Sequence, residues 1–359
     1  MAAMIQDPFG RTLDYVRISI TDRCNYRCLY CMPAQGIDWI PHEKIMTYED
    51  IFLLCSVLSE LGVKRIRFTG GEPFVRKGFV SFLHDIRRRF PEIGIAVTTN
   101  GDFLERWASE LIALGLNSVN ISLDTLNPEK FLYITRGGIL ERVLRGIDVL
   151  AASGEVPVKL NTVVMREFNL TEIPELVRFA DNKKVLLRFI EFMPLDTDVW
   201  SKQQYVSADE VLSLLPHRLL WQPLGRQGTS GGIPSGPAQY FRNESTGQKI
   251  GIISAVSDHF CHLCNRLRIT STGEVRPCLF SNNGIPIIDA LRRNDRESVR
   301  TGILSAVSRK PRAGDTSLPE GFCSPEEAAL NTFPADQNGT EKTGTKVFHE
   351  ERHMSRIGG

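Results

Sequence analysis

The chain has 359 residues, 42% of them apolar, which is enough for one large domain or for one domain with a smaller appendage. Its 43 Lys and Arg residues nearly balance its 42 Asp and Glu residues, so no global field indicates a nucleic-acid partner or an anionic membrane surface. Residues 1–11 lack an apolar leader, and no run reaches the roughly 18 apolar residues of a membrane span. We therefore expect a cytoplasmic protein that binds neither nucleic acid nor membrane.

Short β-branched runs alternate with helical patterns over the first half of the chain. Helix signals include Thr47 followed by Asp50, a capping-box pattern. Strands that alternate with helices predict a parallel sheet, and six strands are fewer than the eight of a closed barrel. We therefore predict an α/β fold, an incomplete (β/α)6 TIM-like barrel with its site at the carboxyl ends of the strands. The expected strands are Tyr15–Ile20, Arg65–Thr69, Ile93–Thr99, Ser118–Leu123, Val158–Met165 and Val185–Phe192.

A second module follows the sixth strand. The run Gly225–Gln239 holds five glycines and two prolines, which is typical of a mobile loop. Gln248–Pro286 has the pattern of a small β-rich unit, whereas Pro311–Lys346 is polar and is expected to be poorly ordered. The predicted divisions are a partial barrel over 1–224, a smaller α+β module over 225–310, and a polar linker with a Gly-Gly tail over 311–359.

A triplet of cysteines, Cys24, Cys28 and Cys31, follows the first expected strand. An iron–sulfur cubane takes four ligands, so three thiolates would leave one iron open for an external chelator. The alternative is a zinc site, which needs a fourth ligand such as His42. The three-thiolate count favours a cluster. Cys55, inside an apolar helical pattern, is interpreted as packing.

Gly70-Gly71-Glu72-Pro73 ends the second expected strand. The missing side chains let a ligand approach the backbone, and the carboxylate can accept a hydrogen bond from an ammonium group. Alone, this segment is an ordinary turn. Together with the triplet it resembles the glycine-rich motif of radical S-adenosylmethionine enzymes, in which the methionine moiety chelates the open iron. Tyr30 resembles the residue that those enzymes place against the adenine, and a packed core tyrosine is its alternative.

A second triplet, Cys261, Cys264 and Cys278, again supplies three thiolates. Zinc is a stronger alternative here, because His259 or His262 would complete a Cys3His site. The phrase from Phe260 to Thr270 resembles the auxiliary-cluster segment of the GTP 3′,8-cyclases of molybdenum-cofactor biosynthesis. Further phrases that resemble this family are Asp7-Pro8-Phe9-Gly10-Arg11, Thr98-Thr99-Asn100-Gly101, Ser122-Leu123-Asp124, Phe189–Pro194 and Gly358-Gly359.

The resemblance implies two [4Fe–4S] clusters, with S-adenosylmethionine at the first and GTP at the second. It implies that a 5′-deoxyadenosyl radical abstracts the ribose 3′ hydrogen of GTP and that the carbon radical then attacks guanine C8. The product is (8S)-3′,8-cyclo-7,8-dihydroguanosine 5′-triphosphate. An electron donor such as flavodoxin or ferredoxin and the downstream cyclic pyranopterin monophosphate synthase are implied partners, and the protein is expected to be a monomer or a homodimer.

A triphosphate site is expected to contain arginine, because its planar guanidinium group binds phosphate oxygens in pairs. Arg266 and Arg268 lie two residues apart, so an extended segment points both to one face. Each such cation has a solvated surface charge as its alternative. By resemblance, the GTP contacts are Arg17, Arg67, Thr98, Lys159, Arg266, Leu267 and Arg268, and the S-adenosylmethionine contacts are Tyr30, Gly71, Glu72, Ser122 and Met193.

The terminal Gly358 and Gly359 resemble a family tail that enters the active site, where only backbone fits closely. The polar stretch before this tail departs from the family pattern. Two other functions remain open from the sequence: a radical peptide-modifying enzyme, which usually has more cysteines in its second module, and a zinc-stabilised interaction protein, which gives no role to Gly70–Pro73.

Overall fold

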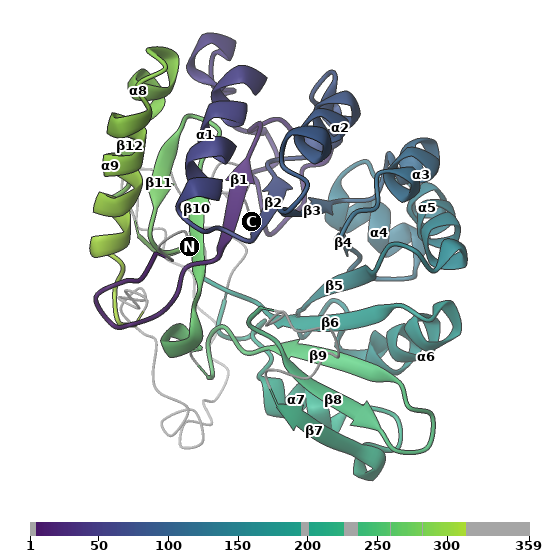
Figure 1. The fold of residues 1–359 in the computed structure, drawn as a ribbon. Helices are drawn as coiled ribbons and strands as arrows, with labels where there is room; N and C mark the ends of the chain where they lie inside the picture. The colour runs from purple at the N-terminus through teal and green to yellow at the C-terminus, as the bar shows by residue number, and fades with distance from the viewer. Residues whose placement is uncertain (1–4, 195–200, 226–235, 259, 282, 314–359) are drawn as a thin grey trace, which may run out of the picture.

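The fold is an open, curved sheet with helices on its outer side, shown by a computed structural model (Figure 1). The structure describes residues 5–194, 201–225, 236–258, 260–281 and 283–313. Over these residues no helix is long and apolar enough to cross a membrane. The expected loop Gly225–Gln239 and the linker and tail from residue 314 onward fall largely or wholly outside the described residues.

All six expected strands are present, each within two residues of its predicted bounds. The reason is the alternation of β-branched runs with amphipathic helices, which is a strong local signal. The first strand, β1, ends at Ser19, and the sixth, β6, ends at Glu191. The six are β1 (Tyr15–Ser19), β2 (Arg65–Thr69), β3 (Gly94–Thr99), β4 (Ser118–Ser122), β5 (Val158–Val164) and β6 (Leu186–Glu191).

The helices between these strands cover the outer side of the sheet (Figure 1). At the start of the first helix, the Thr47 side chain and the Asp50 side chain cap each other's backbone N–H groups, so the predicted capping box is confirmed. Cys55 on this helix is fully buried in the main apolar core, as expected. The helices are α1 (Tyr48–Glu60), α2 (Phe79–Arg89), α3 (Leu104–Ala113), α4 (Pro128–Thr135), α5 (Leu140–Ser153) and α6 (Ile173–Lys183).

The second half of the chain extends both edges of this sheet. The strand β9 pairs in parallel with β6, and β10 pairs in parallel with β1. Further antiparallel strands lie outside each of them, so β9 and β10 are not hydrogen-bonded to each other and the barrel stays incomplete, as predicted. The remaining elements are α7 (Ala208–Ser213), β7 (Trp221–Gly225), β8 (Gln239–Asn243), β9 (Lys249–Ile253), β10 (Arg266–Ile269), β11 (Glu274–Arg276), β12 (Ile285–Pro286), α8 (Ile288–Arg292) and α9 (Arg296–Ser308).

The strand order is β12-β11-β10-β1-β2-β3-β4-β5-β6-β9-β8-β7, and the eight strands from β10 to β9 are all parallel. The C-terminal module is therefore continuous with the barrel sheet through hydrogen bonds at both of its edges. Because the inner face of such a sheet collects side chains from every second residue of each strand, residues far apart in sequence meet there.

Candidate active site

A cavity of about 250 Å³ lies inside the curve of the sheet. Among its described lining residues seven are Arg or Lys and one, Asp124, is a carboxylate. Such a charge imbalance inside a fold of nearly zero net charge marks a local anion site. The seven cations are Arg17, Arg65, Arg67, Lys159, Arg188, Arg266 and Arg268.

Strand register brings these cations together. Arg17 on β1 lies opposite Arg268 on β10 and opposite Arg67 on β2, so the three form one row across neighbouring strands. Two residues earlier, Tyr15 lies opposite Arg266 and Arg65 in the same way. Because side chains two apart point to one face of a strand, both rows face the cavity. The shared face expected for Arg266 and Arg268 is thus present.

Burial, and after it the crowding of positive charge, lowers the pKa values of several of these groups. Burial, followed by Arg268, holds the pKa of Arg17 well below its ordinary value. Burial, followed by Arg266, lowers the pKa of Arg268 to about 10. The pKa of Lys159 falls to about 7 because of burial first and then because of three neighbouring arginines. A polyanion in the cavity would favour the charged form of each group.

Arg67 is held rigidly in the cavity wall. Its guanidinium donates to the Tyr15 hydroxyl at 2.5 Å, to the Val97 carbonyl at 2.8 Å and to the Ser118 hydroxyl at 3.0 Å. A weaker bond of 3.4 Å reaches the hydroxyl of Thr98, another residue predicted from the sequence. These bonds fix the guanidinium before any ligand arrives, which reduces the entropy lost on binding.

Two cavity cations were missed by the sequence analysis. Arg65 shares the inner face of β2 with Arg67, so the same period of two would have found it. Arg188 lies between apolar residues in β6, and its Nε and one terminal nitrogen donate to the Asn161 side chain at 3.0 and 2.7 Å. A charged residue inside a buried strand was the available signal.

Leu267 does not face the cavity. It lies between Arg266 and Arg268, so its side chain points to the opposite face of β10, where it is fully buried in the apolar core. A ligand in the cavity can therefore reach Leu267 only through its backbone. Thr98, Ser122 and Met193, by contrast, all line the cavity with their side chains.

The first cysteine triplet occupies the loop after β1, where all three side chains are partly exposed. Burial, followed by the Glu72 carboxylate, raises the pKa of Cys24 to about 12, and burial also raises the pKa of Cys28. The loop is tied to the end of α4: Arg136 donates to the carbonyls of Arg27 at 3.2 Å and of Met32 at 2.9 Å. Thiols with raised pKa values favour their neutral form until a cation binds them.

The Gly70–Pro73 segment packs against the beginning of this cysteine loop. A Cβ on Gly70 would lie 2.5 Å from the Thr21 carbonyl oxygen, and one on Gly71 would lie 2.3 Å from that of Arg23. The Gly71 and Glu72 amides donate to the same two carbonyls, each at 2.8 Å. The glycines are therefore required by the approach of the protein's own backbone, a reason that the sequence analysis did not foresee.

The Glu72 side chain is fully buried and points away from the solvent. Its carboxylate accepts from the Asn100 amide at 2.7 Å and from the Thr99 hydroxyl at 2.9 Å. A third bond, at 3.1 Å, comes from the Phe74 amide. Burial raises its pKa to about 7. The side chain thus joins the ends of β2 and β3, and its direct contact with an ammonium group remains a prediction.

Tyr30 connects the first triplet to the cavity, which it lines. Its hydroxyl donates to Asp124 at 2.7 Å, and Asp124 also accepts from the Val163 amide at 2.8 Å. Burial raises the pKa of Asp124 to about 6. The ring is thus fixed at one end of the cavity beside Cys31, an interfacial position and not the interior of the core.

The second triplet lies at the same cavity, which Cys261, Cys264 and Cys278 all line. Burial acts to raise the pKa of the Cys264 thiol, but the positive charges of Arg266 and Lys310 outweigh burial, so the pKa is lowered to about 6. Within the described residues no three His, Cys, Asp or Glu side chains gather closely enough to hold one metal ion. His259 and Gly358-Gly359 lie outside the described residues.

Comparisons with known proteins show which families the chain resembles. Residues 18–180 match the radical SAM superfamily, and residues 185–316 match the family Molybdenum Cofactor Synthesis C. A GTP 3′,8-cyclase of Peptoclostridium acidaminophilum is 43% identical over 89% of this chain and 95% of its own length. One of Thermodesulfovibrio yellowstonii is 40% identical over 86% of this chain and 94% of its own length.

A solved structure shares the fold. Streptococcus suis SuiB bound to precursor peptide SuiA superposes with a TM-score of 0.54 at 14% identity, over 83% of this chain and 68% of that protein. At this identity the likeness concerns the fold alone.

Proposed function

This chain belongs to the family of GTP 3′,8-cyclases, and from that membership we propose that its cationic cavity holds GTP and S-adenosylmethionine for the cyclisation of GTP to (8S)-3′,8-cyclo-7,8-dihydroguanosine 5′-triphosphate. It is a radical S-adenosylmethionine enzyme of molybdenum-cofactor synthesis. The observation that carries the substrate assignment is the row of Arg268, Arg17 and Arg67 across three neighbouring strands.

The triphosphate is the group that fits these cations. Its oxygens are the ligands that planar guanidinium groups bind in pairs, and its negative charge offsets the repulsion among buried arginines. Arg266, Arg268 and Arg17 lie on the β10 and β1 side of the cavity, and Lys159 lies across the sheet on β5. The proposed contacts are the side chains of Arg17, Arg67, Thr98, Lys159, Arg266 and Arg268, and the backbone of Leu267.

S-adenosylmethionine is proposed to bind between the first triplet and the middle of the cavity. Tyr30 offers a ring held by Asp124, Ser122 is the last residue of β4, and Met193 follows the end of β6. Gly71 supplies backbone at the first triplet, with Glu72 fixing that backbone through its bonds to Thr99 and Asn100. In this arrangement the adenine and the reacting ribose share a cavity sheltered from bulk water, which protects radical chemistry from side reactions.

Each triplet is proposed to hold a [4Fe–4S] cluster through three thiolates. The first, when bound, supplies the electron for reductive cleavage of S-adenosylmethionine. The second triplet lines the cavity with Arg266 and Arg268, so a cluster held there would supply a binding position for the nucleotide. The proposed partners are an electron donor such as flavodoxin or ferredoxin, which would supply the reducing electron, and a cyclic pyranopterin monophosphate synthase, which would take the product.

The test is anaerobic. The protein is reconstituted with iron and sulfide, and 5′-deoxyadenosine formation from S-adenosylmethionine and dithionite is measured with and without GTP. GTP-stimulated cleavage together with a cyclised nucleotide is expected. Cleavage that does not depend on GTP would overturn the substrate assignment, and a colourless product with tightly bound zinc would overturn the cluster assignment. The matched variant Cys24→Ser should remove cleavage while leaving iron at the second triplet.

A further inference from the structure

The second cysteine triplet is divided between two arms of the chain. Cys261 and Cys264 precede β10, and Cys278 follows β11, which pairs with β10 in the antiparallel direction. A triplet of this kind binds a cluster only if the two arms keep their separation. Two cations bond to the backbone of these arms and of the segment after α9, and neither lines the substrate cavity.

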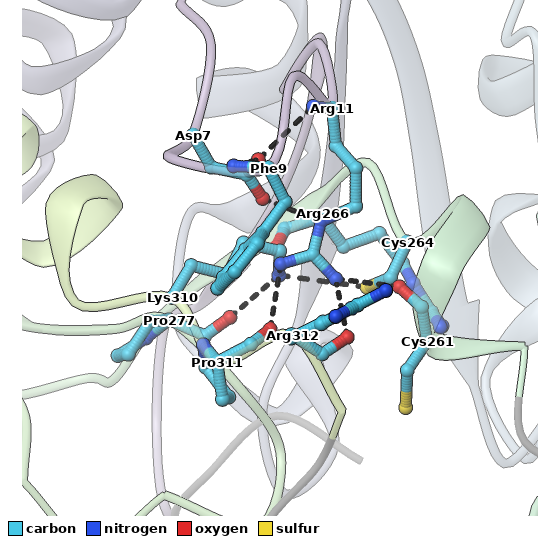
Figure 2. Close-up of polar contacts among 10 residues, drawn as sticks. All are labelled: Asp7, Phe9, Arg11, Cys261, Cys264, Arg266, Pro277, Lys310, Pro311 and Arg312. Atoms are coloured by element: carbon cyan, nitrogen blue, oxygen red, sulfur yellow. Dashed lines mark hydrogen bonds and ion pairs between the residues drawn. The ribbon is translucent and has the colours of Figure 1, made fainter.

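Lys310, just after α9, is the first of them. Only 3% of it is exposed, and its ammonium group donates to the Arg266 carbonyl at 2.8 Å and to the Pro277 carbonyl at 2.7 Å (Figure 2). The same nitrogen lies 3.5 Å from the Cys264 sulfur. An ammonium group has three N–H donors, so these contacts use all of them. Two of the bonds join the arm that carries Cys264 to the arm that carries Cys278.

Arg11 is the second cation. One of its terminal nitrogens donates to the Cys261 carbonyl at 2.6 Å, and the other donates to the Pro311 carbonyl at 2.6 Å (Figure 2). It therefore connects the first cysteine of the triplet to the residue after Lys310. The Asp7 carboxylate holds Arg11 in place through the Arg11 Nε at 2.5 Å and the Arg11 amide at 3.0 Å.

These contacts explain the structural role of the N-terminal segment Asp7-Pro8-Phe9-Gly10-Arg11. Its turn closes through the Gly10 amide, which donates to the Asp7 carbonyl at 3.0 Å, and Gly10 has the positive φ of 77° that such a turn needs. The turn thereby fixes Asp7, and Asp7 orients the guanidinium. The phrase is a support for Arg11 and not a substrate loop.

We propose that Lys310 and Arg11 form a cationic clamp, a pair of positioning residues that hold the three thiolates of the second triplet in place for a cluster and stabilise its reduced form. This inference rests on the proposed second cluster. Burying an ammonium group is costly unless every donor is satisfied, so an apolar side chain would fill the same space more cheaply if packing were the only role. Hydrogen bonds and positive charge near cluster sulfurs raise the reduction potential.

The experiment uses the full chain with Cys24, Cys28 and Cys31 replaced by Ala, so that only the second triplet can take up iron. After anaerobic reconstitution, iron and sulfide content, the midpoint potential by spectroscopic titration, and the rate of iron loss to a chelator are measured. Lys310→Met is compared with Lys130→Met, whose ammonium donates to the Phe168 carbonyl at 2.7 Å and bonds to Glu172, with no described bond to either triplet.

Lys310→Met should lose iron about tenfold faster than the same chain with Lys310 intact, which is the usual cost of removing a residue that supports a metal ligand. The midpoint potential of the second cluster should move to more negative values. Lys130→Met should leave both unchanged. Lys310→Arg keeps the positive charge and should recover much of the potential. Arg11→Met should increase the rate of iron loss, while Arg87→Met, which also removes bonds to backbone carbonyls, should not.

Three results separate the possible failures. A parent that takes up no cluster would overturn the proposed second cluster itself. A parent with a cluster whose potential and iron loss do not respond to Lys310→Met would overturn the clamp alone. A further control is a chain in which Cys261, Cys264 and Cys278 are replaced by Ala. Loss of the first cluster from that chain on Lys310→Met would also overturn the clamp, because Lys310 would then support the fold in general and not the second triplet.

Discussion

Arg17 and Arg268 occupy opposing positions on the neighbouring parallel strands β1 and β10, although 251 residues separate them in the chain. Burial and the nearby Arg268 hold the pKa of Arg17 well below its ordinary value, and burial with Arg266 lowers the pKa of Arg268 to about 10. The repulsion between two buried like charges lowers the free energy of unfolding of the ligand-free protein, and an anion that binds between them removes this repulsion. Their arrangement therefore favours binding at the expense of stability.

Replacing Arg17 by Met should separate these two effects. GTP binding should weaken by roughly 1.5–3 kcal/mol, the range for hydrogen bonds to a charged group, while the ligand-free protein should melt at the same or a higher temperature. Calorimetric titration and thermal unfolding measure the two quantities. Arg178→Met, at an exposed position on α6, is the control and should change neither. A lower melting temperature with unchanged affinity would contradict the assignment.

Lys159 predicts a pH dependence of GTP binding. Its pKa is lowered to about 7 in the ligand-free protein, and a bound triphosphate favours the charged form and raises this pKa. Between the two pKa values binding must take up a proton, so affinity should fall as pH rises from about 7 toward 9. Titrations in two buffers of different ionisation enthalpy measure this uptake. It should be much reduced in Lys159→Met, and an equal uptake in that variant would exclude Lys159 as the source.

Gly71→Ala should disturb the first triplet. Its new Cβ would lie 2.3 Å from the Arg23 carbonyl oxygen, a backbone atom that cannot move without shifting the cysteine loop. We expect lower iron content at the first triplet and little 5′-deoxyadenosine, with the second triplet loaded normally. Gly154→Ala, at a left-handed position with open space around it, gives the control for backbone strain alone and should cost about 1 kcal/mol of stability with full iron. Equal iron in both variants would refute the explanation.

Deleting Gly358 and Gly359 should abolish cyclisation while both clusters remain. This prediction comes from the family tail motif, in which only backbone fits at the substrate. The double substitution Gly358→Ala/Gly359→Ala keeps the length and should also impair product formation, because each residue gains a methyl group. Product and iron are measured side by side. Full activity of the truncated protein would remove the tail from the site.

The local sequence pattern predicted the six inner strands of the barrel but not the strands that pair with its two edges. The six inner strands follow from alternation along the chain, which each segment displays by itself. The pairing of β10 with β1, and of β9 with β6, depends on contacts between distant segments, and no local period contains that information. For the same reason Gln248–Pro286 was interpreted as a separate β-rich unit, whereas its strands β9 and β10 belong to the barrel sheet.

Residues of the candidate site could be predicted from the sequence where they belong to a recognisable motif. The second cysteine triplet, Tyr30 and all five proposed GTP cations line one cavity. Leu267 shows the limit of a motif, because a strand must point alternate side chains to opposite faces and Leu267 lies on the core face. Lys310 was not predictable, since an isolated lysine after a helix is ordinarily solvated and only the folded chain reveals its three acceptors.

The pairing of β1 with β10 also affects how the protein is made. During synthesis β1 emerges early, but the strand that covers its outer edge follows about 250 residues later. At ribosomal rates of roughly 5–20 residues per second, this edge stays open for more than ten seconds. An open parallel edge recruits other chains, and non-local pairing is slow to form. Premature termination before residue 266 would therefore yield an aggregation-prone fragment, not a smaller working enzyme.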